Sequence, residues 1–253
     1  MPRHDWWSKE FQKMVVLGES TVEGGWWTAS ASERWADILA NLINQCQRTP
    51  MQYVNKGIGA NAISPRSPGY AASRKPSALE RYRKDVIAEK PDLFILCYGL
   101  NDMRAGMPLN DFVDDMRTIV ADVKNACAPL IVLTTIYYMT GWKSYPPYDR
   151  GSVTLTGAFN RAIKTLAKVQ GCLVADVWDA EGQADWLIHP DGVHANKIGN
   201  ILIGNRVFET IAKNASALSN SVYERDLPGR VAQELIQIRE SQGDPYRAWW
   251  RKR

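Results

Sequence analysis

Asp92-Leu93-Phe94-Ile95-Leu96-Cys97-Tyr98 is a nearly unbroken apolar run in the middle of a 253-residue chain. A strand with one wet face alternates apolar and polar residues, so a run of this kind predicts a strand that is buried on both faces. Leu130-Ile131-Val132-Leu133-Thr134-Thr135-Ile136 has the same character. Strands of this type are typical of α/β proteins, in which helices cover both sides of a parallel sheet.

Segments with strand-like and helix-like patterns alternate along the chain on both sides of this run. The predicted strands are Met14–Leu17, Met51–Val54, Asp92–Tyr98, Leu130–Ile136 and Cys172–Val177. The predicted helices are Arg34–Cys46, Leu79–Ala88, Leu109–Ala126, Leu155–Val169 and Ala195–Ala212. This alternation predicts an α/β fold with a parallel five-stranded sheet and right-handed crossovers. Residues 62–77 and 137–153 are long loops rich in Pro, Ser and Tyr, and such loops are usually functional or mobile.

The end of the chain has a different character. We divide the chain into a domain over residues 1–219 and a C-terminal helical tail over residues 220–253. One short amphipathic helix is predicted in the tail from the apolar residues Val231, Leu235, Ile236 and Ile238. Residues 247–253 are basic and aromatic, which can suit a membrane surface or a nucleic acid, but a frayed or partner-docked tail is the favoured interpretation. A homo-oligomer formed through the tail is therefore one expectation.

Composition narrows the class of protein. The net charge of +4 is small for this length, so no long-range field for nucleic acid is implied. Residues 1–20 lack a signal-peptide pattern, and Met14–Leu17 is too short to span a membrane, so a soluble cytoplasmic protein is expected. The four cysteines have no CxxC spacing, which argues against a zinc site or a disulfide framework. No cofactor is expected.

Two stretches that are far apart in the sequence carry chemistry. Lys13–Ser20 is a predicted buried strand followed by a sharp turn that ends in a serine. His189-Pro190-Asp191-Gly192-Val193-His194 contains two of the three histidines of the chain. An Asp three residues before a His, on a loop that enters a helix, can put a carboxylate beside an imidazole. Such a pair activates a serine nucleophile, so the combination predicts acyl transfer or ester hydrolysis.

The predicted topology brings these residues together. Ser20 follows the first predicted strand, and Asn101 follows the third. Asp191 and His194 come after the fifth. Because the carboxyl ends of parallel strands share one edge of the sheet, where ligands bind, we expect all four residues at that edge.

Four separated blocks resemble the SGNH hydrolases, also called the GDSL esterase/lipase family. Gly18–Ser20 resembles the Gly-Asp-Ser block of the family, and Asn55–Asn61 resembles its glycine-bearing block. Gly99–Asp102 matches Gly-x-Asn-Asp, and Asp191–His194 matches Asp-x-x-His. The resemblance spans roughly residues 13–214. It implies a flavodoxin-like, three-layer α/β/α sandwich that hydrolyses acyl esters without a metal.

The resemblance assigns roles to the matching residues. Ser20 carries over as the nucleophile, His194 as the base that takes its proton, and Asp191 as the residue that orients the imidazole. Each residue also has an ordinary structural alternative, such as a helix cap, a core hydrogen-bond donor or a turn carboxylate. A metal site on His189, Asp191 and His194 is argued against because no further His or CxxC completes it.

The resemblance also implies donors for an oxyanion. Asn101 carries over as a donor through its side-chain amide, and Ser20 as a donor through its backbone N–H. The glycine of the second block falls on Ala60, with Gly59 just before it, and either residue can supply a third N–H. Glu19 stands where the family has Asp, which affects the geometry of the turn rather than the mechanism.

Aromatic residues on the predicted loops are candidates for a substrate-binding wall. We expect Trp26, Trp142 and Tyr145 to contact substrate, since the loop over Tyr137–Arg150 leaves the carboxyl end of the fourth predicted strand. Such walls suit sugar rings and apolar acyl groups equally. The expected function is a serine esterase, a carboxylic ester hydrolase acting on small or sugar-like molecules. An acyltransferase on the same site and a catalytically silent binding module of the same fold are the alternatives.

Overall fold

The centre of the molecule is a sheet of five parallel strands in the order β2-β1-β3-β4-β5. The computed structural model describes residues 4–219 and residue 237. The strands are β1 Lys13–Gly18, β2 Gln52–Gly57, β3 Leu93–Cys97, β4 Leu130–Thr134 and β5 Leu173–Ala175. This strand order is flavodoxin-like, and the predicted parallel five-stranded sheet is confirmed.

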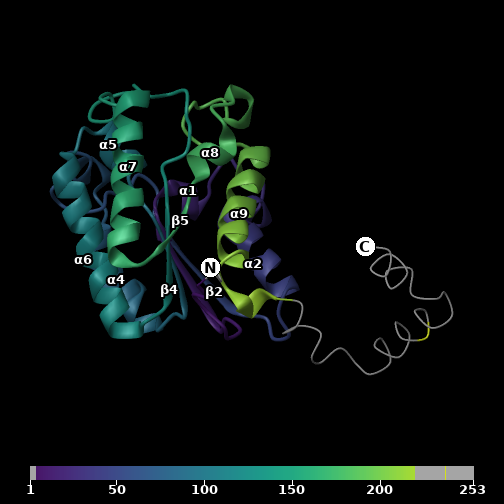
Figure 1. Cartoon of the computed structure of the whole chain (residues 1–253). Helices are drawn as coiled ribbons and strands as arrows, with labels where there is room; N and C mark the ends of the chain where they lie inside the picture. Colours follow the sequence, from purple (N-terminus) through teal and green to yellow (C-terminus); the bar gives the residue numbers. More distant parts are fainter. Residues whose placement is uncertain (1–3, 220–236, 238–253) are drawn as a thin grey trace, which may run out of the picture.

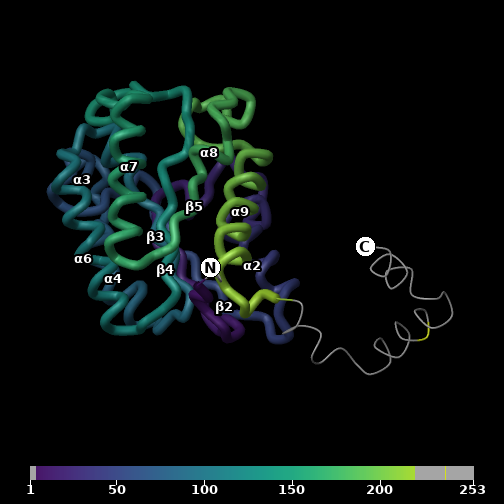
Figure 2. Tube along the Cα trace, in the orientation of Figure 1, coloured from purple at the N-terminus to yellow at the C-terminus, as the bar shows by residue number. Residues whose placement is uncertain are grey.

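Helices cover both faces of the sheet and make three layers (Figures 1 and 2). On one face, α2 (Trp35–Gln45) packs against α9 (Lys197–Ala212). A Cβ at Gly204 of α9 would lie 2.9 Å from the carbonyl oxygen of Trp35, so a glycine lets these helices approach closely. The other face is covered by α4 Ala78–Asp85, α6 Leu109–Cys127 and α7 Val153–Gln170. The predicted α/β/α sandwich is therefore confirmed.

The core explains why the two apolar runs are strands. β3 lies between β1 and β4, and Phe94 pairs with Val15 on one side and Ile131 on the other. Phe112 of α6 and Phe159 of α7 pack ring against ring over the sheet, with centroids 4.9 Å apart. Burial of each such side chain contributes roughly 1.5–3 kcal/mol.

Short helices follow the carboxyl ends of the strands. They are α1 Ser20–Glu23, α5 Leu100–Arg104 and α8 Val177–Glu181. A further short helix, α3 (Tyr70–Ser73), lies within the predicted loop 62–77. Single 3₁₀ turns are η1 Ala31–Glu33, η2 Ile87–Glu89, η3 Asp185–Leu187 and η4 Ser216–Leu218. None of the short helices was predicted, because four or five residues give too little periodicity to detect.

Some predicted boundaries are wrong for local reasons. The strand predicted to Ile136 ends at Thr134, because the Ile136 N–H donates to Asn160 Oδ1 of α7 at 2.8 Å instead of to a strand. The strand predicted to Val177 ends at Ala175, because the Asp176 side chain caps α8. The last helix begins at Lys197 rather than Ala195, with Asn196 as its N-cap. The remaining boundaries differ by a few residues at most.

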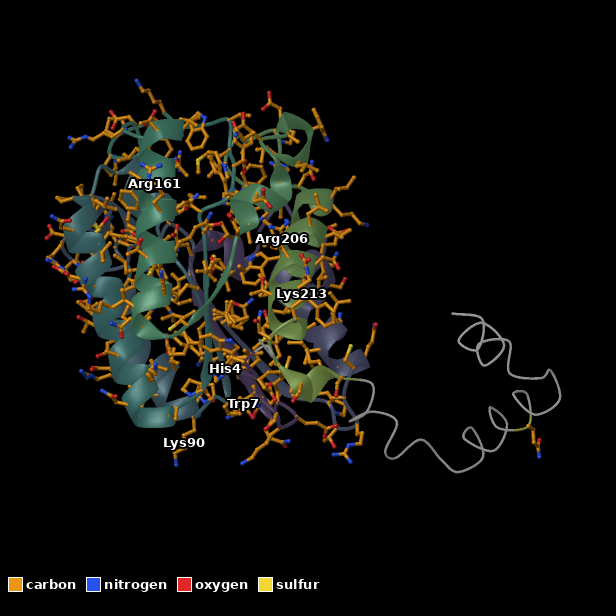
Figure 3. All side chains as sticks on the ribbon, in the orientation of Figure 1. His4, Trp7, Lys90, Arg161, Arg206 and Lys213 are labelled. Carbon is orange, nitrogen blue, oxygen red and sulfur yellow. The ribbon has the colours of Figure 1, made fainter. Side chains whose placement is uncertain are left out.

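The first described residues pack against the end of α9. Trp6 N–H donates to the Asn214 carbonyl at 2.8 Å, and the Ala217 N–H donates to the Trp7 carbonyl at 3.1 Å (Figure 3 labels Trp7). The predicted tail helix near residues 231–238 lies outside the described residues, apart from residue 237. Within the part of the chain that the structure describes, no helix is both long enough and apolar enough to cross a bilayer.

Candidate active site

Ser20 lies on the turn between β1 and α1, and this turn requires a glycine at position 18. A Cβ at Gly18 would lie 2.3 Å from Val22 Cγ2 and 2.9 Å from the Cys97 carbonyl oxygen. The chain then turns directly from β1 into α1, of which Ser20 is the first residue and not the cap. The Ser20 backbone N–H has no acceptor among the described residues.

A compact loop carries His194 and Asp191. The His189 N–H donates to the His194 carbonyl at 2.7 Å and closes the loop before α9. Asp191 Oδ1 accepts hydrogen bonds from the Val193 and His194 N–H groups at 2.8 and 2.9 Å. Because this carboxylate is fixed by its own loop, the Asp-x-x-His spacing is enough to set it beside the imidazole.

Ser20, His194 and Asp191 form a continuous hydrogen-bonded chain. The Ser20 hydroxyl oxygen lies 2.9 Å from His194 Nε2, and His194 Nδ1 lies 2.6 Å from Asp191 Oδ2. With Nδ1 carrying the proton that Asp191 accepts, Nε2 is left to accept a hydrogen bond from the serine. The structure thus brings together all three residues that the sequence predicted as catalytic.

The imidazole is shielded from water on one side by Trp27. The two rings are stacked, with centroids 3.5 Å apart and planes 3° apart. Burial lowers the pKa of His194 below its usual value, although the hydrogen bond and charge of Asp191 act in the opposite direction. A lowered pKa keeps the imidazole neutral near pH 7, which is the form that can take a proton.

Glu19 ties the serine turn to α5. Its buried carboxylate accepts the N–H groups of Gly99, Leu100 and Asn101 at 2.7, 3.0 and 3.0 Å. These are orphan donors at the start of a helix, and a carboxylate is the acceptor that suits them best. Glu19 therefore supports the local turn, as the sequence predicted, and it fixes the position of Asn101 relative to Ser20.

Asn101 and Ala60 lie on the same cavity as Ser20. Asn101 is buried, and its side-chain amide donates to the Asn61 carbonyl at 3.1 Å. Ala60 has a φ of 55°, so a residue with a side chain occupies the left-handed conformation here, at a cost of about 1–2 kcal/mol. Its N–H has no acceptor among the described residues. The N–H of Gly59, in contrast, is bound by the Glu23 carboxylate at 2.6 Å.

Arg81 of α4 links the carboxyl ends of two neighbouring strands, β1 and β2, by hydrogen bonds. Its guanidinium is buried and donates to the Lys56 carbonyl at the end of β2 and to the Gly18 carbonyl at the end of β1, at 2.9 and 3.2 Å. It also donates to the Tyr98 hydroxyl at 2.7 Å and pairs with Asp85. Arg81 was not predicted from the sequence, because nothing in a helical pattern marks one arginine as facing inward.

The cavity at this edge has a volume of about 410 Å³. Its lining residues are Ser20, Trp26, Trp27, Gly59, Ala60, Asn101, Arg104, Ser144, Tyr145, Tyr148, Asp191, Val193 and His194. Trp26 and Tyr145 are thus where the sequence predicted, and both are largely exposed. Trp142 is not among these residues, because its ring packs against Tyr138 and Trp178 instead.

Several lining residues were not predicted as site residues. Trp27, Arg104, Ser144 and Tyr148 all face the cavity. Only the two aromatic residues carried a signal in the sequence, because Trp27 follows Trp26 directly and Tyr148 falls on the predicted loop 137–153. Arg104 follows the Gly-x-Asn-Asp block by two residues. The direction in which its side chain points, however, depends on the short helix α5, which was not predicted.

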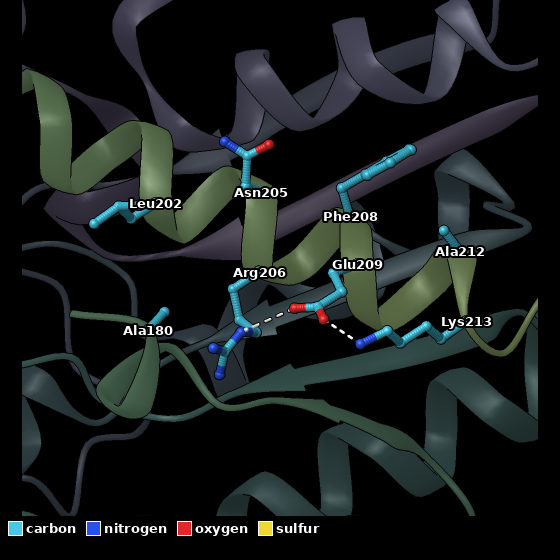
Figure 4. Close-up of a pocket in the computed structure, with 8 residues that line it drawn as sticks. All are labelled: Ala180, Leu202, Asn205, Arg206, Phe208, Glu209, Ala212 and Lys213. Carbon is cyan, nitrogen blue, oxygen red and sulfur yellow. Dashed lines mark hydrogen bonds and ion pairs between the residues drawn. The ribbon is translucent and has the colours of Figure 1, made fainter. Parts of the chain in front are cut away.

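A larger cavity of about 540 Å³ lies over α8 and α9, away from this edge (Figure 4). Arg206 and Lys213 both pair with Glu209 there. Its lining holds no serine, histidine or cysteine, so it has no counterpart of the Ser20–His194 pair. Among the residues described, no group of three or more His, Cys, Asp or Glu side chains is arranged to hold a metal ion.

Solved structures share this fold. A lipase/acylhydrolase from Enterococcus faecalis has a TM-score of 0.64 at 19% identity, over 80% of this chain and 96% of that one. Axe2, an acetylxylan esterase from Geobacillus stearothermophilus, has a TM-score of 0.60 at 20% identity, over 81% of this chain and 95% of that one. At these identities the likeness shows the fold alone.

Sequence comparison gives the family. A curated acetylxylan esterase from Geobacillus stearothermophilus is 23% identical over 176 residues, which is 64% of this chain and 72% of that protein. The model of the GDSL-like lipase/acylhydrolase family matches residues 16–201, a span that runs from β1 into α9 and includes Ser20 and His194. The chain therefore belongs to the GDSL-like lipase/acylhydrolase family and is a carboxylic ester hydrolase.

Proposed function

We propose that the protein is a serine esterase that works through an acyl-enzyme, with Ser20 as the nucleophile. The observation that carries this proposal is the chain of hydrogen bonds from Ser20 Oγ through His194 to Asp191, at 2.9 and 2.6 Å. His194 takes the serine proton as the hydroxyl attacks the ester carbonyl, and returns it to the leaving alcohol. Asp191 holds the imidazole in the tautomer that this requires. Water then hydrolyses the acyl-enzyme.

The negative charge of the tetrahedral intermediate falls on the former carbonyl oxygen. We assign its stabilisation to the Ser20 N–H, the Ala60 N–H and the Asn101 amide. The free N–H of Ala60 supports this choice over Gly59, whose N–H is already bound by Glu23. Donors fixed where charge develops are worth about 2.7–4 kcal/mol each. The left-handed backbone of Ala60 is a local strain of the kind that active sites keep for positioning.

Small acylated molecules are the substrates that we propose. The cavity of about 410 Å³ has room for a small substrate, and the exposed rings of Trp26 and Tyr145 offer apolar faces beside Ser20. The similarity to an acetylxylan esterase supports an acylated sugar-like molecule as one member of this class. Trp142 has no part in this proposal, because its ring is packed outside the cavity.

Replacement of the nucleophile and the base tests the proposal. We expect Ser20→Ala and His194→Ala each to lower kcat/KM on a short-chain aryl ester by about a thousandfold or more. Wild-type enzyme should react with a fluorophosphonate at one site per chain, and Ser20→Ala should not. His4→Ala is the matched control, since His4 lies beside the end of α9, far from the catalytic edge (Figure 3).

Retention of more than about a tenth of wild-type turnover by Ser20→Ala or His194→Ala, a barrier change of only ~1.4 kcal/mol, would overturn the assignment. Wild-type protein that neither hydrolyses aryl esters nor reacts with the fluorophosphonate would favour the silent binding module instead. Circular dichroism of each variant shows whether a loss of activity reflects a loss of fold.

A further inference from the structure

The cavity beside Ser20 contains a positive charge that ester hydrolysis does not need. Arg104 is the last residue of α5, and only 5% of its surface is exposed. It lines the same cavity as Ser20 and His194. An arginine side chain stays protonated in proteins, so this part of the cavity carries a full positive charge.

The protein itself provides few hydrogen-bond acceptors and no carboxylate partner, among the described residues, for the Arg104 guanidinium. It forms no ion pair with any described residue. One terminal nitrogen donates to the Ser144 hydroxyl, and the guanidinium lies 5.6 Å from the centroid of the Tyr148 ring. Its Nε–H is buried and has no acceptor in the described structure. A buried cation without a carboxylate partner is costly, so most proteins supply one.

The other buried arginine of the described residues follows that rule. Arg81 is buried to the same degree and pairs with Asp85 at 2.8 Å. Even Arg66, which is exposed, pairs with both Asp111 and Asp115. Arg104 differs from Arg81 in having no carboxylate partner, and of the two buried arginines it is the one that lines the cavity beside Ser20.

Two carboxylates of this region, Glu19 and Asp191, are already engaged by other donors. Glu19 contributes to the electrostatic environment of Arg104, but its two oxygens accept the three N–H groups at the start of α5. Asp191 lines the cavity, but its oxygens accept hydrogen bonds from His194 and from the loop backbone. Neither group offers the guanidinium a partner within ion-pair distance.

We propose that Arg104 binds a carboxylate carried by the ester substrate, which would complete its missing ion pair. This inference rests on the proposed function and narrows its substrate class. A guanidinium presents N–H donors in a planar fork that matches the two oxygens of a carboxylate. A phosphate monoester would bring a charge of about −1.5 to −2 against a single cation, whereas a carboxylate matches it.

The carboxylate can belong to the acyl part or to the alcohol part of the ester, and two matched substrate pairs separate these sources. On the acyl side, the mono-4-nitrophenyl ester of adipic acid is compared with 4-nitrophenyl hexanoate, which has the same chain length without the charge. On the alcohol side, 4-acetoxybenzoate is compared with 4-acetoxybenzamide. The measurement is the ratio of kcat/KM within each pair, corrected for hydroxide-catalysed rates.

We expect the wild-type enzyme to prefer the charged ester about 10- to 100-fold in one of the two pairs, the scale of a hydrogen bond to a charged group. Arg104→Met should bring that ratio close to one, and Arg104→Lys should keep part of it. Arg117→Met is the matched control. It removes the same charge from the surface of α6, where Arg117 pairs with Asp114, and it should leave the ratio unchanged.

The outcomes separate this inference from the function on which it rests. Ser20-dependent hydrolysis of the neutral esters, with wild-type ratios near one in both pairs, would reject the role of Arg104 and leave the esterase in place. A preference that survives in Arg104→Met would also reject it. If Arg104→Met does not fold, the wild-type ratios and the Arg104→Lys variant decide. Wild-type protein without hydrolysis of any of these esters and without fluorophosphonate labelling would instead reject the proposed function.

Discussion

At the scale of single residues, the stacking of Trp27 on His194 contributes to the burial of the imidazole. The stacked indole removes water from one face of the imidazole, and desolvation is the largest cause of the lowered pKa of His194. As the proposed base, His194 is active only when neutral, so activity should fall as pH drops through this pKa. We therefore expect the acid limb of kcat/KM to lie below about pH 6.5.

Trp27→Ala tests this cause directly. Removal of the indole exposes the imidazole to water, which favours its charged form and raises the pKa of His194. We expect the acid limb of the kcat/KM profile to move to higher pH, toward 6.5. Trp26→Ala is the matched control, because its exposed ring contacts His189 and not His194. An acid limb that stays in place in Trp27→Ala would contradict the role given to desolvation.

Asp191 and His194 could be paired from the sequence because their geometry is local, whereas Ser20 and Asn101 were placed beside them by the predicted topology and the family resemblance. Asp191 and His194 share a six-residue loop, so their spacing alone specifies the contact. The direction in which Arg104 points depends on α5, and the position of Trp27 depends on a loop that folds back over His194. Such placements depend on tertiary contacts that no short stretch of sequence encodes.

At the scale of elements, α8 ends on a buried carboxylate that ties two segments together. Glu181 accepts the Tyr138 N–H at 2.9 Å and so anchors the start of the long loop after β4. Its other oxygen is buried without a partner. Burial raises the pKa of Glu181 to about 8, so the folded protein holds this group protonated at neutral pH.

This raised pKa makes stability depend on pH. Between about pH 4.5 and 8 the unfolded chain has lost the Glu181 proton while the folded chain keeps it, so unfolding releases a proton and stability falls as pH rises. The slope from this group approaches 1.4 kcal/mol per pH unit. We expect Glu181→Gln to lose this slope, measured as the free energy of unfolding in urea from pH 5 to 8.

Asp185→Asn is the control for this experiment, because Asp185 is an exposed carboxylate that accepts a hydrogen bond from the hydroxyl of the same Tyr138. It should keep the wild-type slope. Equal slopes in Glu181→Gln and wild type would show that Glu181 is ionised in the folded protein.

Elements were predictable where apolar patterning is strong. β3 and β4 follow directly from their apolar runs. The loop after β4 was not predictable in the same way, because the Thr140 and Gly141 N–H groups both bind the Gly192 carbonyl. That contact joins segments about fifty residues apart. It helps explain why Tyr145 reaches the cavity while Trp142 packs elsewhere.

At the scale of the whole molecule, the strand order places β1 in the middle of the catalytic edge. With β2 on one side and β3 on the other, the turns that carry Ser20, Ala60 and Asn101 become neighbours. Arg81 links the ends of β1 and β2 beneath them. The family resemblance and the alternation of elements predicted this edge. The cross-links below it could not be predicted, because a helical pattern does not reveal which polar residue faces inward.

Three predictions stay untested: the division of the chain at residue 219, a homo-oligomer formed through the tail, and a cytoplasmic location. A variant that ends at Ser219 tests both the division and the homo-oligomer. All the residues that line the catalytic cavity lie between Ser20 and His194, and Ala217 already closes the packing against Trp7. We therefore expect the shortened chain to keep kcat/KM on a short aryl ester within about threefold, less than 1 kcal/mol in barrier.

Light scattering of the full and the shortened chain measures their association states. A larger particle for the full chain than for the shortened one is expected if the tail joins subunits, and equal association states would place any subunit contact elsewhere. Loss of activity in a shortened chain that remains folded would show that residues 220–253 contribute to the site, and the division at residue 219 would then be wrong.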